Sequence, residues 1–389
     1  MVDHSGGIKL DDVAIYRALQ QHLNEMPVRY PKTKNGSDLK LLRSFFTLAE
    51  AKIALSLDYK YRSVAEICSR LGEAGISPEE LEQKLDIMAG KGIFCSESNG
   101  EKNYALVPFL TGMFEMKVNN LSPELISDVL EFLPGGFALE YLTTSIPQMR
   151  IIPVEEAIEV THAIANYDEL EALINNADRI CVTECICKKI GDMRDIPCSR
   201  TSRREICLYF RKYAETFLRE HWGREITKEE ALEIARQNEQ DGLILQPSND
   251  QNPQGICACC SCCCGILSML KVLPKPAKLV ASNYFAEADS TACKGCNTCV
   301  KRCHMSAITV ANRVARVDLD RCIGCGLCVS TCKPKAMHLV KKQRESVPPE
   351  SVEIMYENIM QHKKGLWGKI KMVLNQNPIK LIKNLKNAS

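Results

Sequence analysis

Cysteine is the residue type in this sequence with the most chemistry to offer. The chain has 21 cysteines among 389 residues, and 19 of them lie between Cys181 and Cys332. Thiols at this density either form disulfides or bind metals. Disulfide frameworks belong mainly to small secreted domains, and the first residues show no basic segment followed by an apolar one, so no secretory signal is visible. We therefore expect most of these thiols to be metal ligands.

The strongest pattern is an internal repeat of 29 residues. The run Cys293-x2-Cys296-x2-Cys299-x3-Cys303 is followed by the run Cys322-x2-Cys325-x2-Cys328-x3-Cys332. An iron–sulfur cube needs four thiolates at the corners of a tetrahedron, and two-residue spacers let one tight loop supply three of them. The fourth cysteine of each run begins the next helical turn and points away, so it is predicted to ligate the other cluster.

This crossed arrangement predicts two [4Fe–4S] clusters. The first would be held by Cys293, Cys296, Cys299 and Cys332, and the second by Cys303, Cys322, Cys325 and Cys328. Glycines within the two loops suit a backbone whose N–H groups must turn toward sulfur. Zinc also binds sets of four cysteines, and it is the alternative occupant. Two matched runs of four favour iron–sulfur clusters over zinc.

The segment from about residue 285 to 342 resembles bacterial-type two-cluster ferredoxins. That resemblance implies a ferredoxin-like fold and an electron-carrying role. The proline usual after each fourth cysteine is His304 in one copy and Lys333 in the other, which leaves ligation intact but puts the tuning of the potential in doubt. The whole chain is similar to multi-cysteine iron–sulfur proteins of anaerobes, a class with no assigned reaction.

Eleven further cysteines lie in the central part of the chain, from Cys181 to Cys264. They suffice for two more cubes with three thiols to spare, or for one larger or site-differentiated cluster. The two-residue spacers indicate that Cys257, Cys260 and Cys263 ligate one cluster. A second interleaved pair is Cys259-x2-Cys262, and the other central thiols are expected to be shared with Cys185, Cys187, Cys198 and Cys207, the remaining expected ligands. Structural zinc and metal-free redox thiols are the alternatives. The sequence therefore leaves open whether the central region holds one or two additional iron–sulfur clusters.

Basic residues are interspersed among the first central thiols. They are Lys188, Lys189, Arg200, Arg203 and Arg204. Such cations can stabilise a reduced, anionic cluster or an acidic partner. A solvated basic face is an equally simple interpretation.

The secondary structure that the sequence indicates around these cysteines predicts an α+β protein. Its mainly helical winged-helix-like and cysteine-rich regions would precede a ferredoxin-like two-cluster module. The expected segments are an N-terminal extension (1–37), a winged-helix-like domain (38–118), a helical cysteine-rich domain (119–280), a two-cluster ferredoxin domain (281–342) and a basic amphipathic tail (343–389).

The winged-helix expectation rests on apolar spacing and capping residues. It predicts helices on both sides of a turn near Thr47, a helix from Ser63, a helix from Ser77, and then a hairpin. The helix from Ser77 would be the recognition helix, yet residues 78–90 carry four acidic side chains against one lysine. DNA binding requires basic contacts. We therefore expect an interaction domain and consider DNA an improbable partner.

Charge and hydropathy bound the location. The chain has 50 basic and 48 acidic residues, which gives no global reason to bind nucleic acid or a membrane. No run approaches the roughly 18 apolar residues of a spanning helix. From His362 to Ser389 the tail is basic and amphipathic; it would cover the chain's own core, an acidic partner or an anionic membrane surface. The expected location is the cytoplasm, with peripheral contact at the inner membrane face left open.

These observations favour an iron–sulfur electron-transfer protein or subunit that passes low-potential electrons in anaerobic metabolism. Its partners would be redox proteins. The alternatives are a reductase with a substrate-binding cluster in the central region and a redox-sensing winged-helix regulator. Whether the chain is itself an enzyme stays open. No catalytic residue is predicted, because the histidines are scattered singly, and neither G-x-G-x-x-G nor a P-loop occurs.

Overall fold

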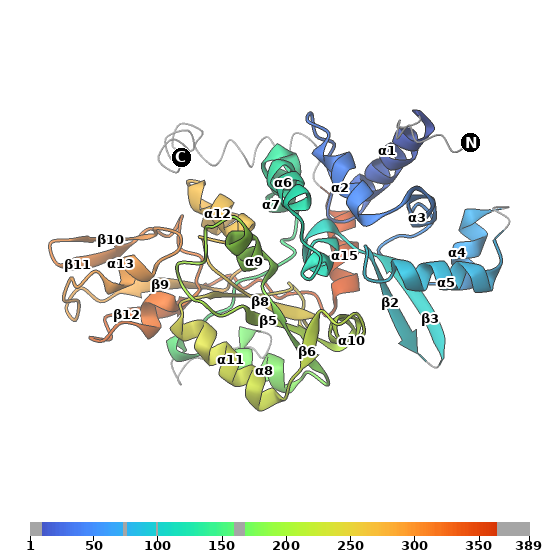
Figure 1. Ribbon diagram of the computed structural model, residues 1–389. Coiled ribbons are helices and arrows are strands. Elements are labelled where there is room, and N and C mark those ends of the chain that lie inside the picture. The colour runs from blue at the N-terminus through green and yellow to red at the C-terminus, as the bar shows by residue number, and fades with distance from the viewer. Residues whose placement is uncertain (1–9, 73–75, 99, 159–167, 364–389) are drawn as a thin grey trace. The chain divides into compact units, whose positions relative to one another are not determined.

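The computed structural model describes residues 10–72, 76–98, 100–158 and 168–363 (Figure 1). The chain divides into two compact units, residues 1–141 and 142–389, which we describe separately. Both contain helices and strands, in agreement with the α+β class. No helix in the described ranges is long and apolar enough to cross a membrane. The finer division into five segments stays a prediction, and the amphipathic tail beyond residue 363 lies outside the described residues.

The first unit is mainly helical. Its elements are α1 (Leu10–Glu25), α2 (Ser37–Phe45), α3 (Leu48–Ala54), β1 (Arg62–Ser63), α4 (Val64–Leu71), α5 (Pro78–Met88), β2 (Ile93–Ser98), β3 (Glu101–Leu106), η1 (Phe109–Met113), η2 (Glu115–Lys117), α6 (Pro123–Phe132), η3 (Leu133–Phe137) and α7 (Ala138–Leu142). Strands β1, β3 and β2 form an antiparallel sheet in that order. The predicted hairpin is therefore confirmed as β2 and β3.

The helix starts of this unit follow from local sequence. Thr47, Ser63 and Ser77 each accept a hydrogen bond from the backbone N–H three residues later. Such caps satisfy N–H groups that the first turn of a helix leaves unpaired. The turn near Thr47 and the two later helix starts are confirmed.

Helix α1 falls within the segment that we expected to be a weakly patterned extension. It buries Tyr16, Leu19 and Leu23, and it packs on α2 and α3. Its buried face also contains Gln20, whose amide donates to the carbonyl of Tyr30 at 2.7 Å. This polar residue on the buried face interrupts the apolar stripe, and the sequence pattern is correspondingly weak.

The second unit begins with short helices and a large sheet. Its elements up to residue 278 are η4 (Glu155–Ala157), α8 (Leu170–Asn175), β4 (Ile180–Glu184), α9 (Ile186–Met193), β5 (Glu205–Phe210), α10 (Arg211–Arg219), β6 (Gly223–Glu225), α11 (Lys228–Gln240), β7 (Ile244–Pro247), β8 (Gly255–Cys259), α12 (Gly265–Val272) and η6 (Pro276–Lys278). The five strands form an antiparallel sheet in the order β6-β4-β5-β8-β7. Helices α10 and α11 pack on it, and α8 packs on α11 (Figure 1).

This sheet corrects the expectation of a mainly helical cysteine-rich region. Strands β4 and β5 are buried along almost their whole length, so they lack the alternation of apolar and polar residues that marks a half-exposed strand. Short, continuously apolar runs do not distinguish a buried strand from a buried helix.

The rest of the second unit reflects the 29-residue repeat. Its elements are β9 (Tyr284–Ala288), α13 (Thr298–Arg302), β10 (Ile308–Ala311), β11 (Val314–Val317), α14 (Leu327–Ser330), β12 (Met337–Lys341) and the final helix α15 (Val352–Gln361). β9 pairs with β12, and β10 pairs with β11, both antiparallel. Each ladder therefore joins a strand of one copy to a strand of the other, so the two copies are interlocked in one unit.

Candidate metal centres

The cysteines of the second unit fall into three groups. The repeat cysteines are the eight of the two matched runs, Cys293, Cys296, Cys299, Cys303, Cys322, Cys325, Cys328 and Cys332. The six-thiol ring consists of Cys185, Cys187, Cys207, Cys257, Cys259 and Cys264. The four-thiol loop consists of Cys198, Cys260, Cys262 and Cys263. Cys181 belongs to none of them; it is buried in β4, and burial raises the pKa of its thiol to about 12.

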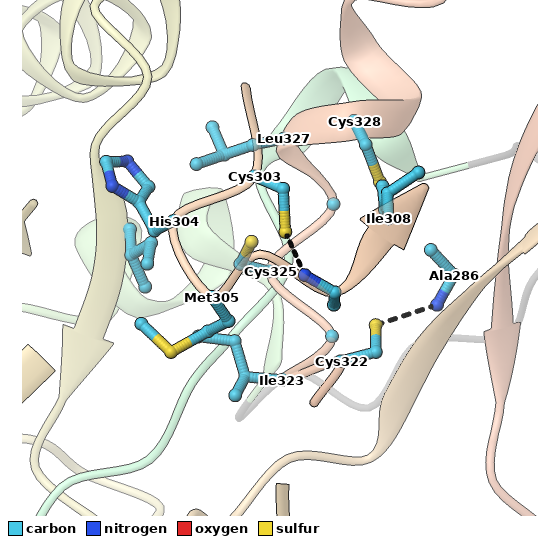
Figure 2. A pocket seen from close by; sticks show the side chains of 14 residues that line it. Ala286, Cys303, His304, Met305, Ile308, Cys322, Ile323, Cys325, Leu327 and Cys328 are labelled. Atoms are coloured by element: carbon cyan, nitrogen blue, oxygen red, sulfur yellow. Dashed lines mark hydrogen bonds between the residues drawn. The ribbon is translucent and has the colours of Figure 1, made fainter. Parts of the chain in front are cut away.

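One predicted ligand set lines a single pocket. Cys303 comes from the first copy, and Cys322, Cys325 and Cys328 come from the second, and all four border the same space. Figure 2 shows their sulfur atoms turned toward that space, between apolar side chains such as Ile323. The fold therefore brings together the four cysteines that the spacing assigned to one cluster, with one from the first copy and three from the second.

The other predicted ligand set consists of the equivalent cysteines of the repeat, Cys293, Cys296, Cys299 and Cys332. Cys299 is buried in the core that the two copies share, and Cys293 and Cys332 pack against that core. Cys296 is exposed. This set therefore reaches the surface at Cys296, whereas Cys328 of the other set is buried and Cys325 is partly buried.

Backbone N–H groups point at four of the repeat sulfurs. The donors are Ala286 to Cys322 (3.3 Å), Ala315 to Cys293 (3.4 Å), Ala307 to Cys303 (3.3 Å) and Ala336 to Cys332 (3.3 Å). The first two bonds are related by the repeat, and so are the last two. Ala286 precedes the first run yet serves the second, and Ala315 does the reverse. Hydrogen bonds of this kind stabilise sulfur that carries negative charge, so the donor set fits thiolate ligands of an iron–sulfur cluster.

The electrostatics of the pocket also fit a metal. Burial raises the pKa of the Cys325 thiol to about 12 and raises the pKa of Cys328 well above its usual value. A thiolate is unstable in an apolar site unless a positive charge compensates it. Metal coordination supplies that charge and deprotonates the thiol. A cationic occupant would therefore favour the thiolate forms of Cys325 and Cys328.

Gly324 occupies a position that no other residue fits. Its φ is +73°, and an added Cβ would lie 2.5 Å from the Ser282 hydroxyl and would overlap the carbonyl oxygen of Tyr284. We expect Gly324→Ala to lower the free energy of unfolding by about 3 kcal/mol, because strain and overpacking add. The measurement is anaerobic thermal denaturation followed by the visible absorbance. Gly100→Ala is the control, with a φ of +78° but open space around it; equal destabilisation of both variants would contradict the packing argument.

The six-thiol ring is assembled from strand and helix ends. Cys257 and Cys259 lie on one face of β8, because alternate residues of a strand share a face. Cys207 lies on the neighbouring strand β5. Cys185 and Cys264 precede the first residues of α9 and α12, and helix N-termini stabilise thiolates.

The ring is closed, because each thiol interacts with two others. The order is Cys185, Cys187, Cys264, Cys259, Cys257, Cys207 and back to Cys185. Hydrogen bonds from the two neighbouring thiols lower the pKa of Cys257 to about 5. The pKa values of Cys185 and Cys264 are lowered in the same way, and those of the three thiols between them are raised.

The four-thiol loop is more compact and more exposed. Its sulfur atoms all lie within 4.8 Å of one another. The Cys260–Cys262 separation is 3.2 Å, and Cys198 lies 3.7 Å from Cys260 and 3.9 Å from Cys262. Four thiolates around one tetrahedral ion at about 2.3 Å would be about 3.8 Å apart. The loop therefore fits a single ion such as zinc or iron as it stands.

Lys188 is a buried cation that contacts the four-thiol loop and interacts electrostatically with the six-thiol ring. Its side chain is fully buried, and its Nζ lies 3.5 Å from the sulfur of Cys260. Burial lowers the pKa of this lysine, but the surrounding thiolates, led by Cys185 and Cys260, outweigh burial and raise it. Hydrogen bonding from Cys263 and the charge of Lys188 lower the pKa of Cys260 to about 4, against the effect of burial. A thiolate at Cys260 is thus compensated by a buried ammonium.

The other basic residues near these thiols mostly serve ion pairs. Lys189 pairs with Glu184 at 2.6 Å, Arg203 with Asp241 at 2.7 Å, and Arg204 with Asp192 at 2.6 Å. Arg200 differs, because its backbone N–H donates to Cys198 at 3.4 Å. The Arg200 guanidinium donates to the carbonyl oxygen of Lys301 at 3.3 Å, so of these five basic side chains, within the described residues, Lys188 is the one that hydrogen-bonds to sulfur.

The central cysteines are grouped differently from the sequence interpretation. We expected Cys257, Cys260 and Cys263 to share one cluster, but Cys257 belongs to the ring and the other two belong to the loop. The two-residue spacer applies to a loop, whereas Cys257 lies on a strand that ends at Cys259. The sequence interpretation noted Cys259-x2-Cys262 as a second interleaved pair but did not name Cys259, Cys262 or Cys264 as ligands. The spacing of Cys257 and Cys259 was the available signal, because a period of two marks one face of a strand.

His304 joins the repeat to the four-thiol loop. It follows Cys303 directly, is buried, and takes the place of the usual proline. The backbone N–H of Ser261 donates to its Nδ1 at 3.3 Å, and its Nε2 lies 2.7 Å from the carbonyl oxygen of Gly242. Ser261 lies between Cys260 and Cys262, so one side chain connects a predicted cluster ligand to the loop.

We expect His304→Ala to lower the free energy of unfolding by about 1–3 kcal/mol, because buried partners on both sides lose hydrogen bonds. Anaerobic denaturant unfolding of the iron-loaded chain measures it. His338→Ala is the control, since His338 is only half-buried on β12. Equal stability of the His304 variant and the unaltered chain would contradict the connection.

Comparisons with known proteins agree with the repeat. A family model described as a 4Fe-4S dicluster domain matches residues 286–333, a span that contains all eight repeat cysteines. A search of curated proteins finds no significant match to the chain. A search of solved structures finds none either. The match supports an iron–sulfur module in the second unit and leaves the rest of the chain to physical argument.

Proposed function

We propose that this chain is an iron–sulfur electron-transfer protein or subunit. The observation that carries the proposal is the match of residues 286–333 to a 4Fe-4S dicluster domain. Cys293, Cys296, Cys299 and Cys332 would hold one [4Fe–4S] cluster, and the pocket cysteines 303, 322, 325 and 328 the other. Bound in this way, such clusters accept and release single electrons at potentials that hydrogen bonds and burial adjust.

The exposure of the two ligand sets supports a proposal for what each set faces. Cys296 is exposed, whereas Cys325 is partly buried and lines the pocket of the other set. The surface set would therefore face a redox partner protein. The set that lines the pocket would face the central thiols, to which His304 and Ser261 connect it. We further propose a low-potential role in an oxygen-free setting, as the density of thiol ligands favours.

Electron uptake tests this function. Full-length protein purified without oxygen is titrated with a low-potential reductant while its visible and electron paramagnetic resonance spectra are recorded. We expect at least two electrons per chain from the repeat and a spectrum in which two reduced clusters interact. A chain that takes up no electrons, although it is folded and contains its metal, would overturn the proposal.

For the first unit we propose a winged-helix-like domain that contacts a partner protein. The acidic helix α5 engages the nearby cations itself: Lys84 pairs with Glu80 at 3.1 Å, and Lys102 of β3 lies 2.7 Å from Asp86. Cations engaged in this way are poor phosphate contacts, and the surplus of carboxylates repels DNA. Fluorescence anisotropy with duplex DNA at low salt tests this point, and tight binding would favour the redox-sensing regulator.

A further inference from the structure

The four-thiol loop contains no repeat cysteine and no member of the six-thiol ring. Cys260, Cys262 and Cys263 lie between β8 and α12, and Cys198 lies between α9 and β5, 62 residues before Cys260 in the chain. Cys260 is buried, Cys198 and Cys263 are partly buried, and Cys262 is exposed. All four thiols are free of disulfides. The fold therefore brings four thiols from two separate segments to one place that reaches the surface at Cys262.

The distances between the sulfur atoms of the loop match one tetrahedral ion. The sulfur of Cys198 lies 3.7 Å from that of Cys260 and 3.9 Å from that of Cys262. The sulfurs of Cys262 and Cys263 are 3.7 Å apart. Thiolates bound to one ion at about 2.3 Å would lie about 3.8 Å apart. The shortest separation, 3.2 Å between Cys260 and Cys262, would have to widen by about 0.6 Å to reach that value.

The same distances do not fit an iron–sulfur cube. A cube places each of its four thiolates on a different iron, with the irons and sulfides of the core between them. Such thiolates lie farther apart than thiolates that share one ion. All four sulfurs of the loop lie within 4.8 Å of one another, so a cube would have to spread the whole set. One ion with four sulfur ligands fits without that rearrangement.

Two hydrogen-bond donors point at sulfurs of the loop. The Nζ of the fully buried Lys188 lies 3.5 Å from the sulfur of Cys260. The backbone N–H of Arg200 donates to the sulfur of Cys198 at 3.4 Å. A divalent ion with four thiolates carries an excess of negative charge, and a buried ammonium and a backbone N–H both stabilise anionic sulfur. The surroundings of the loop therefore favour bound thiolates.

Hydrogen bonds also fix the backbone of the loop. Ser261 lies between Cys260 and Cys262, and its N–H donates to Nδ1 of His304 at 3.3 Å. Its carbonyl oxygen accepts from the hydroxyl of Ser268 at 2.9 Å. Ligands that are held in place before binding lose less conformational freedom when they bind. The loop is therefore preorganised for an ion.

We propose that the four-thiol loop binds one metal ion, zinc or iron, through all four thiolates. Both ions form closed tetrahedral sites with four sulfur ligands. Each thiol that still carries a proton releases it when it binds the ion. Because the site is closed, the ion has no open position for a substrate; it joins the segment around Cys198 to the start of α12. The proposal goes beyond the electron-transfer function and uses none of the repeat cysteines.

The test is a loss of metal without a loss of sulfide, because a single ion contains no sulfide and an iron–sulfur cluster does. The double variant Cys198→Ala with Cys262→Ala removes one ligand from each of the two segments. Zinc, iron and acid-labile sulfide per full-length chain are measured after anaerobic purification. The double variant should lose one zinc or one iron per chain, and it should keep its sulfide and the paramagnetic signals of the repeat. Cys181→Ser, at a buried thiol outside all three groups, is the matched control and should keep every metal.

Two further measurements guard against failure of the double variant to fold. Cys262→His should keep the ion, because three cysteines and one histidine also bind zinc tetrahedrally and Cys262 is exposed. In the unaltered chain, X-ray absorption at the zinc edge should show four sulfurs at about 2.3 Å and no neighbouring metal. If the ion is iron, the Mössbauer spectrum should instead show one iron outside the clusters.

Three results would overturn the proposal. They are a double variant that loses sulfide together with iron, a double variant that keeps all of its metal, and an unaltered chain without a single sulfur-bound ion. Electron uptake by the repeat clusters is measured separately. The electron-transfer function therefore stands or fails independently of these results.

Discussion

Replacing Cys303 by serine is expected to remove about four irons per chain, and to remove them from the set of Cys322, Cys325 and Cys328. The first three cysteines of its own run should keep their metal. The reason is the pocket that these four cysteines line together, with one member from the first copy and three from the second. A cube that loses one of four thiolates in a buried site loses a ligand that water does not readily replace.

Paired substitutions show which cluster is lost. If Cys303 and Cys322 serve the same cluster, the variant with both replaced should still hold the metal of the other repeat cluster. If Cys303 and Cys293 serve different clusters, the variant with both replaced should lose about eight irons. Iron, sulfide and the paramagnetic spectrum of the reduced protein provide the measurement. The opposite pattern, in which Cys303 and Cys293 behave as one site, would contradict crossed ligation.

Replacing Lys188 by methionine is expected to have the second large effect, a lower midpoint potential at the central thiols. The side chain is fully buried beside Cys260 and within the influence of Cys185. Removing a cation next to anionic metal–thiolate groups destabilises the reduced, more negative state, so the midpoint potential of any iron bound by these central thiols should fall. A hydrogen bond to a charged group contributes about 1.5–3 kcal/mol, which corresponds to a fall of about 60–130 mV for one electron.

The neighbouring lysine gives a matched control. Lys189 has the same charge, but it pairs with Glu184 and is partly exposed. Lys189→Met should therefore leave the central potential nearly unchanged, and both variants should leave the potentials of the repeat clusters where they are. Anaerobic redox titration followed by visible and paramagnetic spectra measures all of these. If the two lysine variants shift the central potential equally, Lys188 does not hold the charge that we assign to it.

The repeat was predictable because its chemistry is local in sequence. Three thiols in one loop and a fourth one turn later define a ligand set by spacing alone. The crossed pairing of strands, with Ala286 and Ala315 serving the cysteines of the other copy, follows from the repeat only after folding. Local signals also specified the helix caps of the first unit, whereas α1 was missed because Gln20 interrupts its apolar stripe.

The central site was only partly predictable, because its geometry depends on tertiary structure. Cys207 and Cys257 are far apart in sequence and meet through the pairing of β5 and β8. Cys264 joins the same ring only because α12 begins there. No spacer rule anticipates such a meeting, since it depends on the register of a sheet that the sequence did not reveal.

The central claim is that two interlocked copies of one motif hold two iron–sulfur cubes for electron transfer. The most direct test is the iron, acid-labile sulfide and zinc content of the full-length chain purified without oxygen. The account predicts a coloured protein with at least about eight irons and eight sulfides per chain. A colourless protein, or one with zinc in the repeat in place of iron, would contradict it.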